Sequence, residues 1–269
     1  MSLFLTAARP VRAAARLAAA ALALAAAPAL AQFQTLDVPY VPTPEAVVQA
    51  MLRLADVRPD DYVIDLGSGD GRIAIAAVRD RQARGALGVD IDPDRVAEAR
   101  ANARNAGVAD KVQFRQQDLF KTDFSQATVL TMYLLPDVNL KLRPVILDKL
   151  PAGTRVVSHA FTMAEWEPDA TEEVDGRRVY LWIVPAKVQG QWQVSGPQGG
   201  FTLSLTQDFQ RVQGTAQRQG RSLPIADARL RGARLQFTLD GQRYEGEVGP
   251  GGITAVAAPG AAAGWRATR

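Results

Sequence analysis

The chain has 269 residues, enough for one large domain or two moderate ones with a substantial buried core. It has no cysteine, which excludes disulfides, thiolate zinc sites and cysteine nucleophiles, and its one histidine excludes a multi-histidine metal site, so we expect no bound metal. Hydrophobic residues make up 47% and charged residues 22%, as is ordinary for a globular protein, and the formal net charge is +3.

Residues 1–31 predict a secretory signal peptide. Three arginines and no acidic residue accompany an Ala/Leu run from Leu17 to Ala27, and Ala29-Leu30-Ala31 has the small-x-small form of a cleavage site. The run is shorter than the roughly 20 apolar residues of a standard membrane span. We therefore expect export to the periplasm with cleavage after Ala31. A mitochondrial-type transit peptide and an uncleaved membrane anchor are the alternatives.

Net charge and the pattern of apolar residues divide the chain after residue 31 into two predicted domains, 32–184 and 185–269. Three of the 31 basic residues lie in the leader, so 28 remain against 28 acidic residues. A nucleic-acid partner is therefore not expected. The first domain has 18 basic and 23 acidic residues, a net charge of −5, and the second has 10 and 5, a net charge of +5.

Residues 38–44, VPYVPTP, lead into a predicted helix. Thr43 is placed to cap this helix, with Pro44 at its first position and Glu45 in its first turn. One apolar face follows, made of Val47, Val48, Met51, Leu52 and Ala55. The Pro-rich segment is either a spacer or a wall over a ligand site, with Tyr40 facing inward.

Strands and helices then alternate. We expect strands at 62–67, 85–90, 112–117, 128–133, 154–160 and 178–184, and helices at 71–83, 93–106 and 137–150. This order predicts an α/β fold, a Rossmann-like doubly wound and mostly parallel sheet. Ligands of such sheets bind beyond the carboxyl ends of the strands.

A glycine loop, DLGSGDG, lies between the first strand and the following helix. Gly67, Gly69 and Gly71 allow a tight turn and a close approach of a ligand to the backbone. The spacing G-x-G-x-G is one residue shorter than the dinucleotide fingerprint, and Asp65 and Asp70 would repel a pyrophosphate. These carboxylates favour a ligand with an amino group or a sulfonium.

Two further acidic residues end the next two strands. Asp90 is placed to accept hydrogen bonds from ribose hydroxyls, and Ile91 to lie against an adenine face. Asp118 ends the third strand, where it is placed to accept a hydrogen bond from the adenine amino group. Three acidic strand ends aligned with a glycine loop predict one nucleoside-binding site.

These phrases, VIDLGSGDG, GVDID and QQDLF, resemble the class I S-adenosylmethionine-dependent methyltransferases. The resemblance spans about 38–184 and implies S-adenosyl-L-methionine as the cofactor. It implies that the methionine part is held by Asp65, Gly67, Ser68, Gly69 and Gly71, the ribose by Asp90, and the adenine by Asp118 and Leu119.

Longer phrases, PYVPTP, DLGSGDGRI, DLFKTDFS and LPAGTRVVSHAFTMAEWEP, are similar to a subgroup of small protein-lysine methyltransferases. Its eukaryotic members are membrane-associated and modify an ATP synthase subunit and a nucleotide carrier of the mitochondrial inner membrane. The resemblance implies a protein lysine as the methyl acceptor. The leader and the C-terminal region lie outside the pattern of this subgroup.

The acceptor side is expected at the ends of the fourth and fifth strands. Tyr133 is a candidate for a pocket wall or hydrogen-bond partner, with Asp137 behind it, or else a core aromatic. His159 is a candidate general base, or a structural hydrogen-bonding group. Trp166 is either a pocket wall or a domain-packing residue.

The C-terminal region predicts a small antiparallel β domain. Short alternating runs such as FTLSLTQ and RLQFTLDG are broken by turn residues. Its positive charge permits contact with anionic phospholipid or an acidic partner, unless the arginines only cover the outside of a small sandwich or barrel.

The sequence therefore predicts a methyltransferase that N-methylates a protein lysine. One alternative is a methyltransferase for a small molecule or lipid head group. The other is an exported binding protein that keeps the fold without the activity.

Overall fold

The computed structural model describes residues 40–269. The predicted leader and its cleavage site lie outside these residues. Among the helices of this part of the chain, none is both long and apolar enough to cross a membrane.

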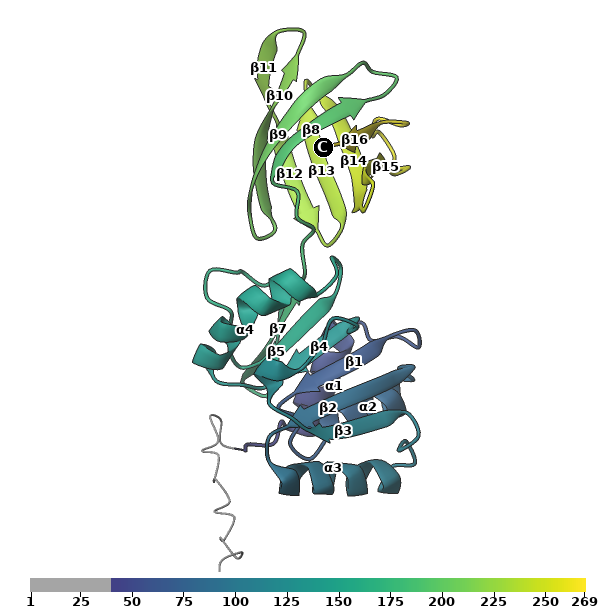
Figure 1. Cartoon of the computed structure of the whole chain (residues 1–269), viewed down its shortest axis with the longest axis vertical. Helices are drawn as coiled ribbons and strands as arrows, with labels where there is room; N and C mark the ends of the chain where they lie inside the picture. Colours follow the sequence, from purple (N-terminus) through teal and green to yellow (C-terminus); the bar gives the residue numbers. More distant parts are fainter. Residues whose placement is uncertain (1–39) are drawn as a thin grey trace, which may run out of the picture. The chain divides into compact units, whose positions relative to one another are not determined.

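The first sheet has seven strands in the order β3-β2-β1-β4-β5-β7-β6 (Figure 1). Neighbouring strands from β3 to β5 are parallel, whereas β7 is antiparallel to both β5 and β6. The predicted mostly parallel α/β sheet is thereby confirmed. Its strands are β1 (Tyr62–Leu66), β2 (Gly85–Asp90), β3 (Val112–Gln116), β4 (Val129–Met132), β5 (Arg155–His159), β6 (Ala170–Val174) and β7 (Arg177–Ile183).

Helices cover both faces of this sheet. Because successive strand residues point to opposite faces, Val63 packs in the same core as α1, α2 and α3, and Ile64 packs in the same core as α4. The apolar face predicted for α1 is fully buried. The helices are α1 (Glu45–Leu54), α2 (Arg72–Arg81), α3 (Pro93–Asn105) and α4 (Pro136–Lys149), with a 3-10 turn, η1 (Leu119–Lys121).

The strand β6 was not predicted. Its sequence, ATEEV, has no apolar run, and its residues are only half-buried or exposed. It lies at the edge of the sheet, where it pairs with β7 alone. An edge strand with one partner does not need the continuous apolar pattern by which buried parallel strands are recognised.

The register brings the predicted acidic residues to one edge of the sheet. Asp65 of β1 lies opposite Gly88 of β2, and Asp90 lies opposite Gln116 of β3. The strands β3, β2 and β1 are adjacent and parallel, so their carboxyl ends meet at the same edge. The glycine loop and η1 leave the sheet at this edge.

The second sheet has nine antiparallel strands in the order β11-β10-β9-β8-β16-β15-β14-β13-β12. The N–H of Ile225 donates to the carbonyl of Gly214 at 3.1 Å, and β10 also contacts β12, so the sheet nearly closes into a barrel. Its strands are β8 (Gly190–Ser195), β9 (Phe201–Asp208), β10 (Arg211–Arg218), β11 (Arg221–Pro224), β12 (Ala226–Arg231), β13 (Arg234–Leu239), β14 (Gln242–Gly249), β15 (Gly252–Ala255) and β16 (Arg266–Thr268).

Side chains fill the interior of the barrel. Phe237 stacks on Tyr244 with ring centroids 5.0 Å apart, and Trp265 meets Tyr244 edge-on at 5.6 Å. Alternating buried positions along β9 and β13 complete this core. The predicted antiparallel β domain is confirmed, and its form is a filled barrel.

Candidate cofactor and acceptor site

The glycine loop joins β1 to α2 at the carboxyl edge of the sheet. Gly67, Gly69 and Gly71 have φ values of 73°, 52° and 82°, in the left-handed region that residues with a Cβ rarely adopt. A side chain at Gly71 would collide with the ring of Phe114 on β3. Glycine at these positions therefore lets the loop turn tightly and lie close against the neighbouring strand.

Asp90 anchors the loop from the end of β2. Its Oδ2 accepts a hydrogen bond from the N–H of Gly69 at 2.8 Å, and its Oδ1 accepts one from the N–H of Asp92 at 3.0 Å. A carboxylate has about four acceptor positions, so further positions remain for hydroxyl donors of a ligand. The predicted ribose-binding acid is thus also part of the loop's own structure.

Asp65 is 1% exposed below the same loop. Burial raises the pKa of Asp65 to about 7, against the effect of the hydrogen bond from Thr131 Oγ1 at 2.7 Å and with further contributions from Asp90 and Asp70. A carboxylate in this position is stabilised by a nearby positive charge. The surroundings of Asp65 therefore fit a ligand with a cationic group.

The remaining predicted cofactor residues lie around this edge. Asp118 accepts from the N–H of Phe120 at 2.9 Å and lies 3.5 Å from the ammonium of Lys121. Ile91 and Leu119 are half-buried. Ser68 Oγ is buried and has no hydrogen-bond partner within residues 40–269.

Arg72, which was not among the predicted site residues, neutralises the second carboxylate of the loop. Its guanidinium pairs with Asp70 at 2.5 Å. Although burial alone would raise the pKa of Asp70, the hydrogen bonds and charge of Arg72 hold that pKa below its ordinary value. The predicted repulsion of a pyrophosphate by Asp70 is weakened by this pair. In the sequence, this ion pair could have been inferred from the phrase GDGR, in which Arg72 follows Asp70 by two residues.

Residues 40–44, which we call the strap, pass beside the loop. A side chain at Gly69 would collide with the ring of Tyr40, so this ring lies directly against the glycine. The guanidinium of Arg95 lies over the Tyr40 ring, 4.8 Å from its centroid. Tyr40 remains 41% exposed. Of the two interpretations of this segment, its contact with the loop favours the wall, with Tyr40 partly exposed at its outer end.

Thr43, at the other end of the strap, does not cap α1 as predicted. Pro44 occupies the N-cap position, and the helix has no side-chain capping bond. The hydroxyl of Thr43 instead lies 3.2 Å from His159 Nδ1. The backbone carbonyl of Thr43 accepts a hydrogen bond from Arg72 Nη1 at 2.9 Å. A tertiary hydrogen bond has replaced the local one.

Tyr133 and His159 come together at the adjacent ends of β4 and β5, where the acceptor side is predicted. Their ring centroids are 3.9 Å apart, and Phe161 stacks on Tyr133 at 6.2 Å. His159 is 1% exposed, and burial, with the positive charge of Arg177, lowers its pKa to about 4. Its imidazole is therefore neutral near pH 7. Leu134, next to Tyr133, packs against Gly67 and joins this group to the glycine loop.

Two other candidates differ in their exposure to solvent. Asp137 is exposed in the first turn of α4. Trp166 is fully buried, its carbonyl accepts from the indole N–H of Trp182 at 2.7 Å, and its ring stacks on Phe209 at 6.1 Å. Of the two interpretations of Trp166, the structure favours packing.

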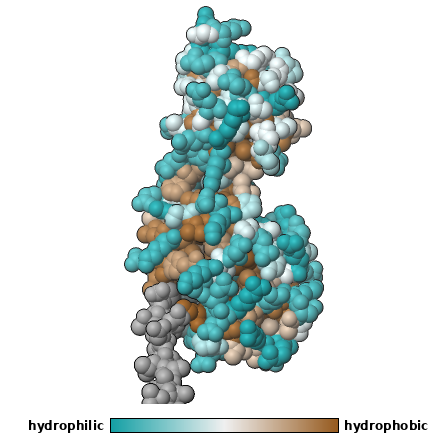
Figure 2. Space-filling view, viewed as in Figure 1, coloured by the Kyte–Doolittle hydropathy of each residue, from teal (hydrophilic) through white to brown (hydrophobic). Residues whose placement is uncertain are grey.

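Exposed apolar side chains occur around the first sheet. The large ones that are exposed within residues 40–269 are Tyr40, Val41, Phe120 and Leu140. Two belong to the strap, and Phe120 belongs to η1, beside Asp118. Figure 2 shows brown, apolar patches on this part of the molecule between hydrophilic residues.

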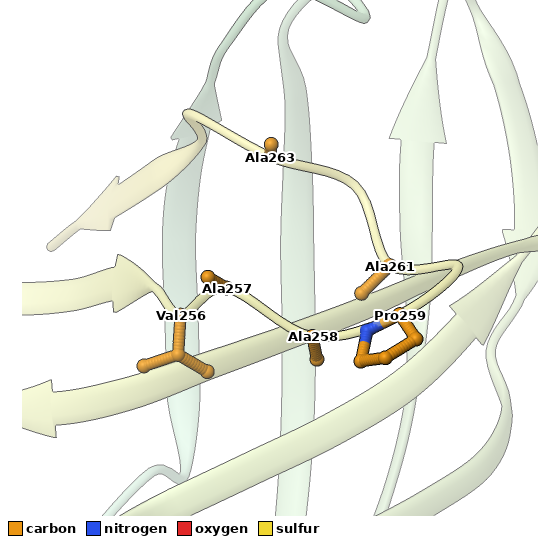
Figure 3. A pocket seen from close by; sticks show the side chains of 6 residues that line it. All are labelled: Val256, Ala257, Ala258, Pro259, Ala261 and Ala263. Carbon is orange, nitrogen blue, oxygen red and sulfur yellow. The ribbon is translucent and has the colours of Figure 1, made fainter.

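A separate pocket lies in the barrel domain, after β15. It has a volume of about 360 Å³ and is lined by Val256, Ala257, Ala258, Pro259, Ala261 and Ala263 (Figure 3). The side chains of these residues have no hydrogen-bonding or titratable groups. This pocket therefore offers no side chain for acid–base chemistry or metal binding.

Comparison with known families gives a match that agrees with this geometry. Residues 65–170 match the family model described as ANTKMT methyltransferase domain. A Saccharolobus islandicus protein named protein-lysine N-methyltransferase is 45% identical over 151 residues, which cover 55% of this chain and 94% of that protein. A mouse protein named adenine nucleotide translocase lysine N-methyltransferase is 36% identical and is covered over 64% of its length.

A solved structure carries a different acceptor in its name. It is described as an RNA methyltransferase from Salinibacter ruber in complex with S-adenosyl-L-homocysteine. It is 56% identical, has a TM-score of 0.54, and is matched over 55% of this chain and 96% of its own. The bound demethylated cofactor agrees with the nucleoside site described above.

Proposed function

This chain belongs to the ANTKMT family of class I S-adenosylmethionine-dependent methyltransferases, and on that premise we propose that it N-methylates lysine side chains of proteins. The observation that carries the proposal is the array at the carboxyl edge of the first sheet. There Asp90 holds the glycine loop, and Leu134 links this loop to the aromatic pair Tyr133 and His159. The loop, Asp90 and Asp118 are the residues predicted to bind the nucleoside.

The residues present fit the cofactor. The glycine loop leaves room for close backbone approach, and the buried carboxyl of Asp65 fits a cationic amino-acid group. When bound, S-adenosylmethionine supplies a methyl group that its sulfonium has already activated for transfer. The protein's tasks are then to hold the cofactor, align an acceptor and exclude water.

The acceptor side suits an amine that must lose its charge. A free lysine has a pKa of about 10.4, and surroundings of low polarity lower it by disfavouring the ammonium form. Tyr133, Phe161 and the neutral ring of His159 form such surroundings. We assign Tyr133 to the wall of the acceptor pocket and leave His159 behind it, because His159 is almost fully buried.

Lysine is favoured over other acceptors by the family relatives. Both named relatives above carry lysine N-methyltransferase in their names, and the archaeal one is covered almost completely. RNA is the second candidate acceptor, because the structure from Salinibacter ruber is named an RNA methyltransferase.

Transfer of tritiated methyl groups tests the proposal. The purified chain is incubated with labelled S-adenosylmethionine and, separately, with total protein, total RNA and phospholipid vesicles. We expect label in the protein fraction, sensitive to protease and resistant to ribonuclease and to lipid extraction. Label in RNA or lipid alone would contradict the lysine proposal and leave the methyltransferase assignment in place.

We also propose that the barrel domain contacts an anionic surface such as a phospholipid membrane. The support is its net charge of +5, with 10 basic and 5 acidic residues, and the exposure of several arginines on its outer wall. These exposed arginines are Arg211, Arg221, Arg229, Arg231, Arg234, Arg266 and Arg269.

A further inference from the structure

The strap links two parts of the site that are far apart in the sequence. At one end the ring of Tyr40 lies on Gly69 of the cofactor loop. At the other end Thr43 meets His159, 116 residues further along the chain. Arg72 connects the two ends, because it pairs with Asp70 of the loop and donates to the carbonyl of Thr43.

Thr43 makes a hydrogen bond to His159 instead of the helix-capping bond that its position before α1 would predict. A threonine just before a helix commonly caps free backbone N–H groups, with a stabilisation of about 1 kcal/mol. Here Thr43 is 4% exposed, α1 has no side-chain cap, and the hydroxyl lies 3.2 Å from Nδ1 of the imidazole. The fold has thus kept the tertiary contact at the expense of the local one.

His159 lies between Thr43 and Tyr133. Its ring packs on Tyr133 with centroids 3.9 Å apart and an interplanar angle of 33°. Its Nε2 is buried and has no hydrogen-bond partner among residues 40–269. The His159 ring thus packs on Tyr133 and has one hydrogen-bond partner among residues 40–269, the hydroxyl of Thr43.

From these contacts we infer that Thr43 and His159 are positioning residues, which hold the acceptor wall at Tyr133 in register with the cofactor loop through the strap. This inference rests on the proposed function, because it assigns Tyr133 to the acceptor side. It predicts that cofactor binding at the loop changes the surroundings of the His159 ring. It also predicts that this change no longer occurs when the Thr43 hydroxyl is removed.

The substitution Thr43→Val tests this with little change in shape, because valine replaces the hydroxyl with a methyl group. Thr43→Ser keeps the hydroxyl and is the conservative variant. Thr154→Val is the matched control, since Thr154 is also buried and donates one hydrogen bond, to the carbonyl of Ala127 at 3.3 Å, away from the strap.

The first readout needs no acceptor. The chain contains one histidine, so the untagged full-length protein labelled with ¹⁵N-histidine gives one set of imidazole signals. On saturation with S-adenosylhomocysteine we expect these signals to shift in the wild type, in Thr43→Ser and in Thr154→Val, and to stay in place in Thr43→Val. A shift of equal size in Thr43→Val would overturn the inference.

The second readout is methyl transfer to the protein fraction that the wild type labels. We expect kcat to fall about tenfold in Thr43→Val, the effect of one lost hydrogen bond on alignment, while KM for S-adenosylmethionine stays within about twofold. Thr43→Ser and Thr154→Val should keep the wild-type kcat. A kcat within twofold of the wild type in Thr43→Val would overturn the inference.

The two readouts separate this inference from the proposed function. If the wild type labels no protein, the lysine proposal has failed, and the imidazole signals still decide whether Thr43 couples His159 to the cofactor loop. If protein is labelled equally by all variants, protein remains the methyl acceptor and the positioning role is wrong.

Discussion

At the scale of single residues, Asp90 has two tasks. It accepts the N–H of Gly69 at 2.8 Å, and the resemblance to the family predicts that it also binds the ribose of the cofactor. Asp90→Asn replaces one acceptor oxygen with a donor and removes the charge. We expect affinity for S-adenosylhomocysteine to fall roughly 10- to 100-fold, the range for a lost charged hydrogen bond.

Isothermal titration calorimetry measures this affinity. Asp110→Asn is the control, because Asp110 is exposed in the turn before β3, at the opposite edge of the sheet. An unchanged dissociation constant in Asp90→Asn would remove Asp90 from the cofactor site.

Asp65 makes stability depend on pH. Its pKa is raised to about 7 by burial, so between about pH 4 and pH 7 the folded chain holds a proton that the unfolded chain has released. The contribution of Asp65 to stability therefore falls as the pH rises through this window. In Asp65→Asn this fall is absent, and the side-chain oxygen still accepts from Thr131.

Denaturant unfolding at pH 5 and pH 8 checks this expectation. Relative to the wild type, Asp65→Asn should gain on the order of 2–4 kcal/mol of unfolding free energy between pH 5 and pH 8. Asp110→Asn, which removes an exposed carboxylate, should show no such gain. A constant difference between wild type and Asp65→Asn at both pH values would show that Asp65 is ionised in the folded protein throughout.

The sequence was sufficient to predict the acidic residues at the strand ends, but the partners of several of them depend on the tertiary structure. Glycine spacing and strand ends marked Asp65, Asp90 and Asp118 because those signals are local. Thr131 reaches Asp65 from 66 residues away, and Thr43 reaches His159 from 116 residues away. A pattern within one segment has no information about such contacts.

At the scale of elements, the glycine loop works together with the strap. A Cβ at Gly69 would have both an unfavourable φ of 52° and a collision with Tyr40. Gly107, which follows α3, has a φ of 71° with nothing near its Cβ position, so it provides a matched comparison. The pair separates the cost of backbone strain from the effects of a change in the cofactor loop and its contact with the strap.

We expect Gly69→Ala and Gly107→Ala each to lose roughly 1–2 kcal/mol of stability, the usual cost of a left-handed residue with a Cβ. Only Gly69→Ala should also weaken the binding of S-adenosylhomocysteine, by about tenfold or more, since a displaced Tyr40 alters the loop. Thermal unfolding and calorimetry give the two quantities. Equal binding by both variants would show that neither the loop geometry at Gly69 nor its contact with the strap affects cofactor binding.

Elements with a strong local signal were predicted within one or two residues, and those without one were missed. Predicted strands at 62–67 and 85–90 correspond to β1 (Tyr62–Leu66) and β2 (Gly85–Asp90), because buried parallel strands are continuous apolar runs. The edge strand β6 has no such run. In the barrel, alternation predicted antiparallel strands, but closure depends on contact between β10 and β12, which no single strand specifies.

At the scale of the whole molecule, the two domains differ in charge. The net charge of −5 over 32–184 and +5 over 185–269 predicts that the barrel, and not the catalytic domain, meets an anionic surface. Arg229 and Arg231 are exposed and lie two residues apart on β12, on one face of the strand. The double variant Arg229→Gln with Arg231→Gln removes two charges from this face.

Co-sedimentation with vesicles containing phosphatidylglycerol tests whether the barrel domain binds an anionic membrane. Each basic residue near an anionic membrane contributes about 1 kcal/mol, so the double variant should bind at least tenfold more weakly than the wild type, and salt should weaken both. Arg104→Gln with Lys111→Gln is the control, because it removes the same charge from the other domain at exposed positions. Equal weakening in both double variants would indicate an effect of net charge alone.

The assignment as a lysine methyltransferase is tested most directly by identifying the amino acid that receives the methyl group. Protein labelled by the purified chain with tritiated S-adenosylmethionine is hydrolysed in acid, and the amino acids are separated by chromatography. We predict that the label elutes with N-methylated lysines and that Asp90→Asn yields little of it. Label on any other amino acid, or in RNA with none in protein, would contradict the account.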